Sequence, residues 1–384
     1  MRFEFATATR VVFGPGSLAG LGEIARPLGQ RALLVSGRSQ ERAERARARL
    51  NAAGLETVPC SIPREPTVDD VRQGAARARR EECELVVAVG GGAVLDGGKA
   101  IAALIANDGD PMDYLEVVGR GRPLARPSAP SNAIPTTAGT GAEVTRNAVL
   151  TSPEHKLKAS LRSPLMLARV ALVDPDLLAG LPPDVIAASG LDAFSQLVEP
   201  FVSLKANAMI DALCREGLAR SARSLGRAHG GDLGTGIRVD LALASLFGGF
   251  ALANAGLGAV HGLAAPIGGS LDAPHGAVCA ALLPAVMEAN IRALGARAPA
   301  APALARYREI AEIVSRTAGA EARDGVAWVR ALVNALAVPG LAHFGLTEGG
   351  IAPIVARARN ASSMRGNPIE LSDGELAEVL RRSL

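Results

Sequence analysis

Aromatic residues are scarce in this sequence: one Trp, two Tyr and eight Phe make up 3% of its 384 residues. The core must therefore be built from Ala, Leu and Val, and Ala-rich segments with Leu at helical spacing favour helices. Lysine is also rare, with four lysines among 41 basic residues. The net charge of +3 is small for this length, and no dense basic stripe with interleaved aromatics is present. We therefore expect no nucleic-acid partner.

Cysteines and export signals are equally sparse. Residues 1–5 alternate polar and apolar like a strand and lack the layout of a signal peptide. The longest weakly polar stretch, from about Leu241 to Ile267, is broken by Asn254 and several glycines, so we predict a buried helix pair and no membrane partner. The cysteines are far apart without a CxxC pair, which favours reduced thiols in a cytoplasmic protein: Cys60, Cys83, Cys214 and Cys279.

The first 180 residues alternate strand-like and helix-like segments, which predicts a parallel sheet with helices on both faces. A brief strand over Leu55–Val58 is expected to end at Pro59. Thr67 is a candidate N-cap. The clearer predicted elements are strands at 31–36 and 84–89 and helices at 40–53, 68–82 and 94–106.

From about Pro182 the Val/Ile runs disappear and Ala/Leu/Arg segments with helix caps dominate. We predict an α/β domain over 1–180 and an all-helical domain over 181–384; the motifs described next assign dinucleotide binding to the first domain and metal and substrate to the second. The predicted helices cover 183–202, 207–227, 236–255, 277–294 and 304–318.

Two glycine-rich segments predict a nucleotide site. Gly90-Gly91-Gly92 follows a buried strand and opens a helix that carries Asp96, so backbone N–H groups can approach a pyrophosphate. A tight turn is the alternative, with Asp96 in the first helical turn. The segment from Ile134 to Thr145 places small hydroxyl residues between glycines, which suits phosphate and ribose or, alternatively, a Ser/Thr turn; its candidates are Thr136, Thr137 and Thr140.

Four further side chains could hold a metal. Asp192 and Gln196 are four residues apart on a predicted helix, which places both on one face. His261 and His275 lie in Gly/Ala-rich apolar surroundings. If the four converge, they offer three strong ligands and one neutral oxygen to a divalent metal. The alternative is a metal-free site in which Asp192 is hydrogen-bonded to the two histidines.

These motifs, in this order, resemble the iron-dependent (group III) alcohol dehydrogenases. The shared features are the triple glycine with Asp-x-x-Lys, the Pro-Thr-Thr-x-Gly-Thr-Gly-x-Glu-Val-Thr loop, Asp174-Pro175, the Gly-Leu-Asp-Ala helix and the Pro-His-Gly block. The resemblance implies the dehydroquinate synthase-like architecture, with NAD or NADP and iron or zinc held between two domains. It also implies reduction of aldehydes or ketones, or oxidation of alcohols, by a homodimer or larger homo-oligomer.

Carried over to this sequence, the resemblance assigns the metal to Asp192, Gln196, His261 and His275. Two positions depart from the family pattern. A histidine is usual where this chain has Gln196, and another is frequent where it has Ala265. A carboxamide is a weaker, neutral ligand than imidazole, so we expect weaker metal binding and a preference against softer ions. Alanine at 265 also removes a proton-relay group.

The resemblance also places Lys158 and Asn147 near the nicotinamide and substrate, with a solvated loop lysine as the alternative for Lys158. The strand at 31–36 is followed by Gly37-Arg38-Ser39, where many NAD-using relatives carry an aspartate that binds the ribose diol. Arg38 can instead bind a 2′-phosphate in a bidentate manner, with Arg42 one turn further on, which predicts NADP(H). The alternative is a solvated turn arginine.

The leading functional hypothesis is metal-assisted hydride transfer between NAD(P)(H) and an alcohol, aldehyde or ketone, with Gln196 as ligand or hydrogen-bond donor to the substrate. A maleylacetate-reductase-like or dehydroquinate-synthase-like activity is the second reading. A nucleotide-binding protein that has lost catalysis is the third, and the Gln196 and Ala265 departures are what it would predict.

Overall fold

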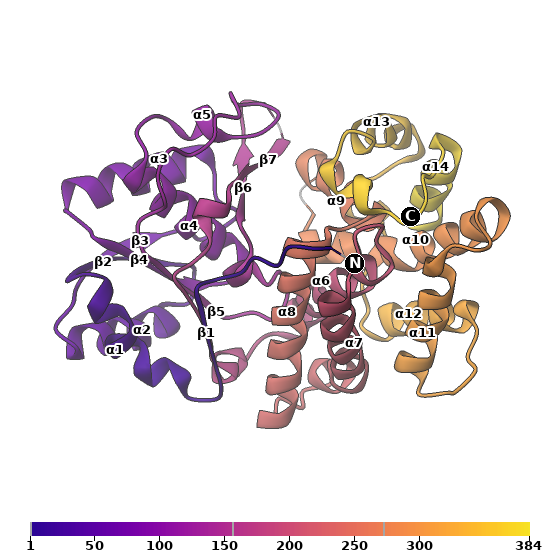
Figure 1. The fold of residues 1–384 in the computed structure, drawn as a ribbon, viewed down its shortest axis with the longest axis horizontal. Helices are drawn as coiled ribbons and strands as arrows, with labels where there is room; N and C mark the ends of the chain where they lie inside the picture. Colours follow the sequence, from indigo (N-terminus) through magenta and orange to yellow (C-terminus); the bar gives the residue numbers. More distant parts are fainter. Residues whose placement is uncertain (1, 156, 272) are drawn as a thin grey trace. The chain divides into compact units, whose positions relative to one another are not determined.

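The structure, a computed structural model, describes residues 2–155, 157–271 and 273–384. The chain forms two compact units. One contains the sheet and spans Ala6–Thr137 and Gly141–Ala179. The other is built around Gly180–Leu384 and also takes in Ala138–Thr140 and the start of the chain. Ribbon colours in Figure 1 follow the chain from indigo to yellow.

The sheet unit contains a six-stranded parallel sheet in the order β1-β8-β5-β4-β2-β3 (Figure 1). This confirms the predicted α/β class with a parallel sheet. Its strands are β1 Arg10–Phe13, β2 Arg31–Ser36, β3 Glu56–Ser61, β4 Leu85–Gly90, β5 Ser131–Pro135 and β8 Val170–Val173. Its helices are α1 Leu21–Ala25, α2 Gln40–Ala52, α3 Val68–Arg80, α4 Gly92–Ala106 and α5 Pro111–Tyr114.

Both faces of this sheet are covered, which explains why β4 is apolar along its whole length. Leu85, Val87 and Val89 pack into one core with α1 and α2. On the other face, a side chain at Gly98 of α4 would collide with Ala88. Successive β4 residues therefore alternate between two helical layers, as the period of a strand requires.

Two sequence-based expectations, one in each unit, are wrong. The brief strand does not end at Pro59, because β3 runs through it to Ser61. β3 is an edge strand. Glu56 donates its N–H to the carbonyl of Gln30, just before β2, and Ile62 donates to that of Ser36, so the alternating pattern turns the nitrogen of Pro59 toward the free edge. Residues 2–5 are not a strand either: Phe5 packs on the ring of Phe250 with centroids 5.8 Å apart.

A small antiparallel hairpin, β6 Asn147–Ser152 and β7 Leu157–Arg162, was not predicted. The predicted Thr67 cap is present, and its hydroxyl and Asp70 form a reciprocal capping box at the start of α3.

Among the residues described from 181 onward, the regular secondary structure is helical, which confirms the predicted all-α region. α6, α8 and α10 are long and apolar enough, by length and composition, to cross a membrane. The apolar windows of α6 and α10 are 83% and 78% buried within the structure, and that of α8, part of the predicted buried pair, is 56% buried. The helices are α6 Pro183–Val202, α7 Ala208–His229, α8 Thr235–Ala255, α9 Ala259–Ser270, α10 His275–Arg297, α11 Pro302–Ser315, α12 Ala322–Ala335, α13 Glu348–Ala358 and α14 Asp373–Arg382.

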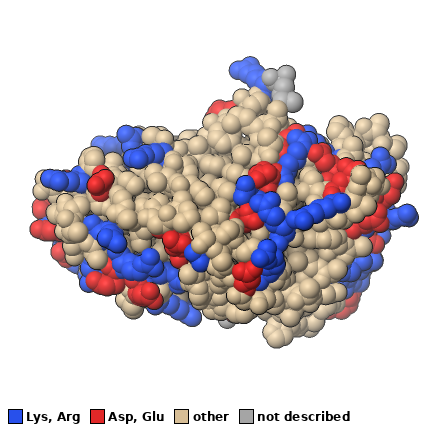
Figure 2. Space-filling model, turned by 90° about the horizontal axis from the view of Figure 1, so that it is seen from below, with Lys and Arg blue, Asp and Glu red and all other residues tan. Residues whose placement is uncertain are grey.

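Arginine and lysine side chains lie among acidic ones on the face shown in Figure 2, where neither sign forms a continuous field. Ion pairs hold several arginines of the described residues. Arg220 and Arg223, for example, both contact Asp240.

Candidate active site

The predicted nucleotide-binding segments lie together at the carboxyl ends of the sheet strands. β2, β4 and β5 are neighbours and run parallel, so the segments that follow them emerge side by side. The chain goes from β2 outward to β3 and then returns to β4 on the other side of β2. Ligands of such sheets bind at the carboxyl ends of the strands where this reversal occurs.

Gly91 begins α4 as its N-cap, and a side chain at this position would lie 3.2 Å from Oγ1 of Thr137. Gly90 accepts a hydrogen bond from the backbone N–H of Thr136. The glycine and threonine segments therefore form one surface in which backbone, rather than side chains, lies beside a helix N-terminus. Such a surface suits a pyrophosphate.

Asp96 has partners within the protein. It lies beyond the first turn of α4, so the alternative that placed it there is wrong. Its Oδ2 accepts the N–H of Val149, and its Oδ1 is 3.0 Å from Nζ of Lys99. Lys99 is buried and also donates to Oγ1 of Thr145 and to the carbonyl of Asn147. Asp96 and Asn147 thus share Lys99 and are held by it.

Arg38 is exposed, and its Nε donates to the carbonyl of Pro63 at 2.8 Å. Ser39 is the N-cap of α2, although its side chain makes no capping bond. Arg42 is already engaged, because it donates to the carbonyls of Leu177 and Ala179. Of the two arginines in the NADP(H) hypothesis, Arg38 is the better placed to receive a phosphate.

Lys158 lies in β7, where it is mostly buried and 3.7 Å from Oε2 of Glu65. It is therefore not the solvated loop lysine of the alternative reading, while its neighbour Lys156 lies outside the described residues.

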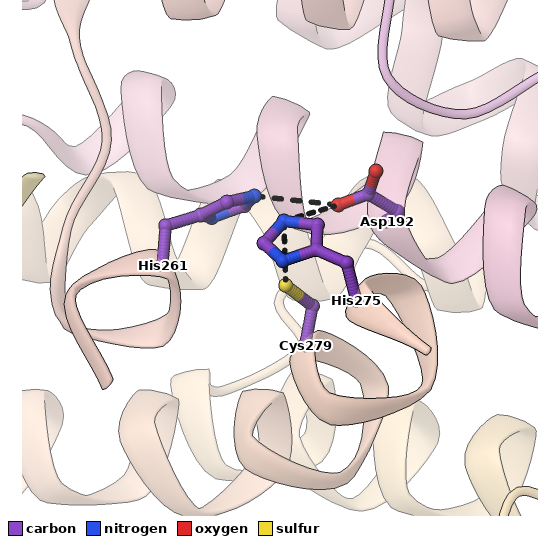
Figure 3. Close-up of side chains that lie close together, drawn as sticks. All are labelled: Asp192, His261, His275 and Cys279. Atoms are coloured by element: carbon purple, nitrogen blue, oxygen red, sulfur yellow. Dashed lines mark hydrogen bonds and ion pairs between the residues drawn. The ribbon is translucent and has the colours of Figure 1, made fainter. Parts of the chain in front are cut away.

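The four predicted metal residues come from three helices of the helical unit. α6 supplies Asp192 and Gln196, α9 supplies His261, and His275 is the first residue of α10. Nε2 of His261 is 3.3 Å from Oδ1 of Asp192, and Nε2 of His275 is 3.8 Å from the same oxygen. Both imidazoles thus point toward one carboxylate (Figure 3).

Close backbone contact between α6 and α10 produces this convergence. A side chain at Gly276 would lie 2.2 Å from the carbonyl oxygen of Ala188 and 3.3 Å from Cβ of Asp192. Only glycine allows the start of α10 to come this close to α6, and the adjacent His275 is thereby placed beside Asp192.

Gln196 is also buried in this group. Its Nε2 donates to the carbonyl of Gly139 at 3.2 Å. Its Oε1 has no hydrogen-bond partner among the described residues, although it is shielded from solvent. Because an unsatisfied buried oxygen is costly, this atom is available to a ligand that enters the site.

Glu199, two turns after Asp192 on α6, contacts the start of α9. Its Oε2 lies 2.6 Å from Nδ1 of His261, and its Oε1 accepts the N–H of Val260 at 2.7 Å. Asn367 accepts the neighbouring N–H of Ala259. Two N–H groups that α9 cannot satisfy internally are therefore bound by side chains.

Cys279 also lies in this group, one turn after His275. Its Sγ is 3.6 Å from Nε2 of His275. Asp192, His261, His275 and Cys279 each offer a donor atom, and these atoms all lie within 4.8 Å of one another.

The acidic and basic side chains of this site shift one another's pKa values. Burial opposes the ionisation of Asp192, but its hydrogen bond with His261 and the charge of His275 outweigh burial and lower the pKa. Burial likewise opposes ionisation of Cys279, and the two histidines lower its pKa. The charge of Cys279, with help from Asp192, raises the pKa of His275 to about 9. The arrangement favours negative donors around one point, where a divalent cation can replace protons.

These residues fit a divalent metal. The set combines a carboxylate, two imidazoles and a thiol, and it lies beside the unsatisfied oxygen of Gln196. All are ligand types that zinc and iron accept. Glu199 resembles the carboxylates that commonly orient metal-bound histidines.

Glu199 was not predicted to be part of the site, and Cys279 was expected to be a reduced thiol without a role in it. Helical spacing held the signal, since Glu199 is seven residues after Asp192 and Cys279 is four after His275. The remaining histidines lie elsewhere: His155 and His343 are exposed, and His229 is in the last turn of α7.

Comparison with known proteins decides the family. A model described as iron-containing alcohol dehydrogenase matches residues 8–175. A second, described as the C-terminal part of the Fe-containing alcohol dehydrogenase family, matches residues 186–384. The chain belongs to the iron-containing alcohol dehydrogenase family.

Relatives of known activity cover nearly the whole chain. The 1,3-propanediol dehydrogenase of Klebsiella pneumoniae is 31% identical, with 99% of this chain and 98% of the relative covered. The lactaldehyde reductase of Escherichia coli strain K12 is 32% identical, with 96% of each chain covered. As an iron-containing alcohol dehydrogenase, the chain is an oxidoreductase that uses a nicotinamide cofactor and a divalent metal to interconvert alcohols and carbonyl compounds.

Solved structures agree in fold. A 1,3-propanediol oxidoreductase superposes with a TM-score of 0.91 at 32% identity, with 100% of both chains covered. Sulfoacetaldehyde reductase from Bifidobacterium kashiwanohense, solved in complex with NAD+, has a TM-score of 0.87 at 26% identity, with 100% of this chain and 99% of that chain covered.

Proposed function

We propose that this iron-containing alcohol dehydrogenase transfers hydride reversibly between C4 of a nicotinamide and the carbonyl carbon of a small aldehyde or ketone. The observation that carries the proposal is the convergence of Asp192, His261 and His275 beside the unsatisfied Oε1 of Gln196. These residues would hold a divalent metal, which would supply Lewis acidity to the substrate oxygen.

The protein's own groups hold and orient the reactants. Asp192, His261 and His275 are the proposed metal ligands. Gln196 serves either as a fourth ligand through Oε1 or as a hydrogen-bond donor to the substrate oxygen. Proton exchange goes through water, because Ala265, at the position where the family resemblance leads us to expect a histidine, is exposed and has no titratable group.

The cofactor is assigned to the edge of the sheet. Gly91, Gly92, Thr136, Thr137 and Thr140 approach the phosphates and ribose, and Asp96 supports this segment through Lys99. Lys158 and Asn147 are the proposed polar groups beside the nicotinamide and substrate. Arg38 and Ser39 bind a 2′-phosphate next to Gly37, so the preferred cofactor is NADP(H). The proposed domains are 1–180 for the cofactor and 181–384 for metal and substrate.

The names of two relatives, 1,3-propanediol dehydrogenase and lactaldehyde reductase, support short hydroxylated alcohols and aldehydes as the substrate class. The test is metal analysis of protein purified without chelator, joined to assays of NADPH and NADH oxidation with short aldehydes. Bound metal with turnover supports the proposal. Turnover with maleylacetate would favour the second reading, and nucleotide binding without turnover would favour the protein that has lost catalysis.

We further propose a cytoplasmic homodimer or larger homo-oligomer without nucleic-acid or membrane partners. The apolar, Ala-rich composition supports assembly through helices. Light scattering at micromolar concentration tests it, and a monomeric mass would contradict it.

A further inference from the structure

Cys279 is a thiol that the proposed hydride transfer does not use, and it is fully buried among residues assigned to the metal. His275 and Cys279 are four residues apart on α10 and so share a helical face. Figure 3 shows the thiol directed at the imidazole of His275, on which Asp192 also converges.

Two of the separations in this group match those between ligands of one ion, and a third, 3.8 Å between Nε2 of His275 and Oδ1 of Asp192, is slightly longer. With Zn–N bonds of about 2.0–2.1 Å and a Zn–S bond of about 2.3 Å, tetrahedral angles place nitrogen and sulfur about 3.6 Å apart, and nitrogen and a carboxylate oxygen about 3.4 Å apart. The structure has 3.6 Å between Nε2 of His275 and Sγ of Cys279, and 3.3 Å between Nε2 of His261 and Oδ1 of Asp192.

We propose that Sγ of Cys279 is a ligand to the metal ion, which is then held by one carboxylate, two imidazoles and one thiolate. The proposal rests on the proposed function, in which Asp192, His261 and His275 bind a divalent metal. Two negative ligands balance the charge of the ion. These four side chains would hold the ion, which would polarise the substrate oxygen.

A thiolate changes which metal the site selects. Soft sulfur ligands favour zinc over harder ions. Cys279 thus reverses the expectation, drawn from Gln196 alone, that the site leans away from softer metals. With Cys279 as the fourth ligand, Gln196 need not bind the metal. The buried Oε1 of Gln196 can then accept a hydrogen bond from the substrate hydroxyl.

The test compares the unmodified enzyme with Cys279→Ser and with Cys214→Ser, the latter a matched control because Cys214 is equally buried in the helical unit. Each protein is stripped of metal, kept reduced and reloaded with zinc or cobalt. X-ray absorption at the zinc edge should show one sulfur scatterer at about 2.3 Å in the unmodified enzyme and the control. The cobalt forms should show a thiolate-to-metal charge-transfer band in the near ultraviolet.

Cys279→Ser should lose both signals, and its zinc affinity should fall by at least about ten-fold, the scale found even for residues that only support a ligand. The unmodified enzyme alone is decisive if the serine variant does not fold. An active zinc enzyme with nitrogen and oxygen scatterers only would overturn the role of Cys279 and leave the proposed function standing. An unmodified enzyme that retains no metal would overturn both.

Discussion

Glu199 and His261 form a buried pair in which the carboxylate oxygen Oε2 lies 2.6 Å from the ring nitrogen Nδ1. A carboxylate can only accept, so Nδ1 must carry the proton. This fixes the ring and leaves Nε2 facing Asp192, the position from which a neutral imidazole binds metal. Glu199 is therefore a positioning residue.

Glu199→Gln should lower metal affinity by about 10–100-fold, because one amide oxygen cannot accept from both His261 and Val260. Competition with a chromophoric chelator measures this without any assay of activity. Glu309→Gln is the control, since Glu309 pairs with Arg215 near the surface. Unchanged metal affinity in Glu199→Gln would contradict the positioning role.

His275→Ala should abolish bound metal while the fold is kept, because His275 is half-exposed at the start of its helix. Loss of the Lewis acid should reduce the rate by about two orders of magnitude or more, equivalent to several kcal/mol of transition-state stabilisation. Elemental analysis, circular dichroism and kcat measure the three quantities. Full activity in the metal-free enzyme would contradict a Lewis-acid role of the metal.

Gln196→His should tighten metal binding, because imidazole is a stronger donor than a carboxamide. The substitution also removes the buried Oε1, which has no hydrogen-bond partner among the described residues. Metal titration of the stripped protein measures the change, and weaker binding than in the unmodified enzyme would argue against a place for residue 196 beside the ion.

The sequence predicted correctly those helices and strands whose bounds are set by their own residues and not by contacts with the rest of the fold. β2 and α6 have the predicted bounds, Arg31–Ser36 and Pro183–Val202, because an apolar run between polar ends and a proline start are visible in the chain itself. The path of β3 through Pro59 could not be read in this way. Whether a missing N–H matters depends on the edge at which the strand lies, which is a property of the whole sheet.

The site shows the same division. Helical spacing placed Asp192 and Gln196 together, whereas His261 and His275 were joined to them through the family resemblance. Helical spacing aligned Glu199 with Asp192 and Cys279 with His275, but spacing alone could not show that both side chains meet histidines of the site, because that depends on how α6, α9 and α10 pack. The contact of Gly276 with Ala188, which sets the approach of α10 to α6, is likewise visible only after folding.

The cofactor preference can be tested at Arg38. Arg38→Ala should raise KM for NADPH by about ten-fold or more and leave KM for NADH nearly unchanged, since a hydrogen bond to a charged group contributes about 1.5–3 kcal/mol. Arg64→Ala, at another exposed arginine of the sheet unit, is the control. Steady-state kinetics with both cofactors decide it, and a higher kcat/KM with NADH in the unmodified enzyme would show the preference to be wrong.

Gly37→Asp should shift the preference toward NADH by repelling the 2′-phosphate and binding the ribose diol. A side chain at Gly37 would lie 3.1 Å from Cγ2 of Val94, so Val94→Ala combined with it provides room. The ratio of kcat/KM for the two cofactors should fall toward NADH in the double variant and stay unchanged in Val94→Ala alone. An unchanged ratio in the double variant would argue that the ribose lies elsewhere.

Glu143, buried in the segment after the glycine-threonine loop, should make stability depend on pH. Burial raises its pKa from 4.5 to about 7, so the folded protein keeps this carboxyl protonated where the unfolded chain has already lost the proton. Stability should therefore fall as the pH rises from about 4.5 to about 7 and then level off, by about 3 kcal/mol at 1.36 kcal/mol per pH unit. Glu143→Gln keeps the shape and remains neutral, so it should remove this slope and be the more stable protein at pH 8. Urea unfolding at pH 5 and pH 8 measures both proteins, and parallel pH profiles would show that Glu143 is ionised in the fold.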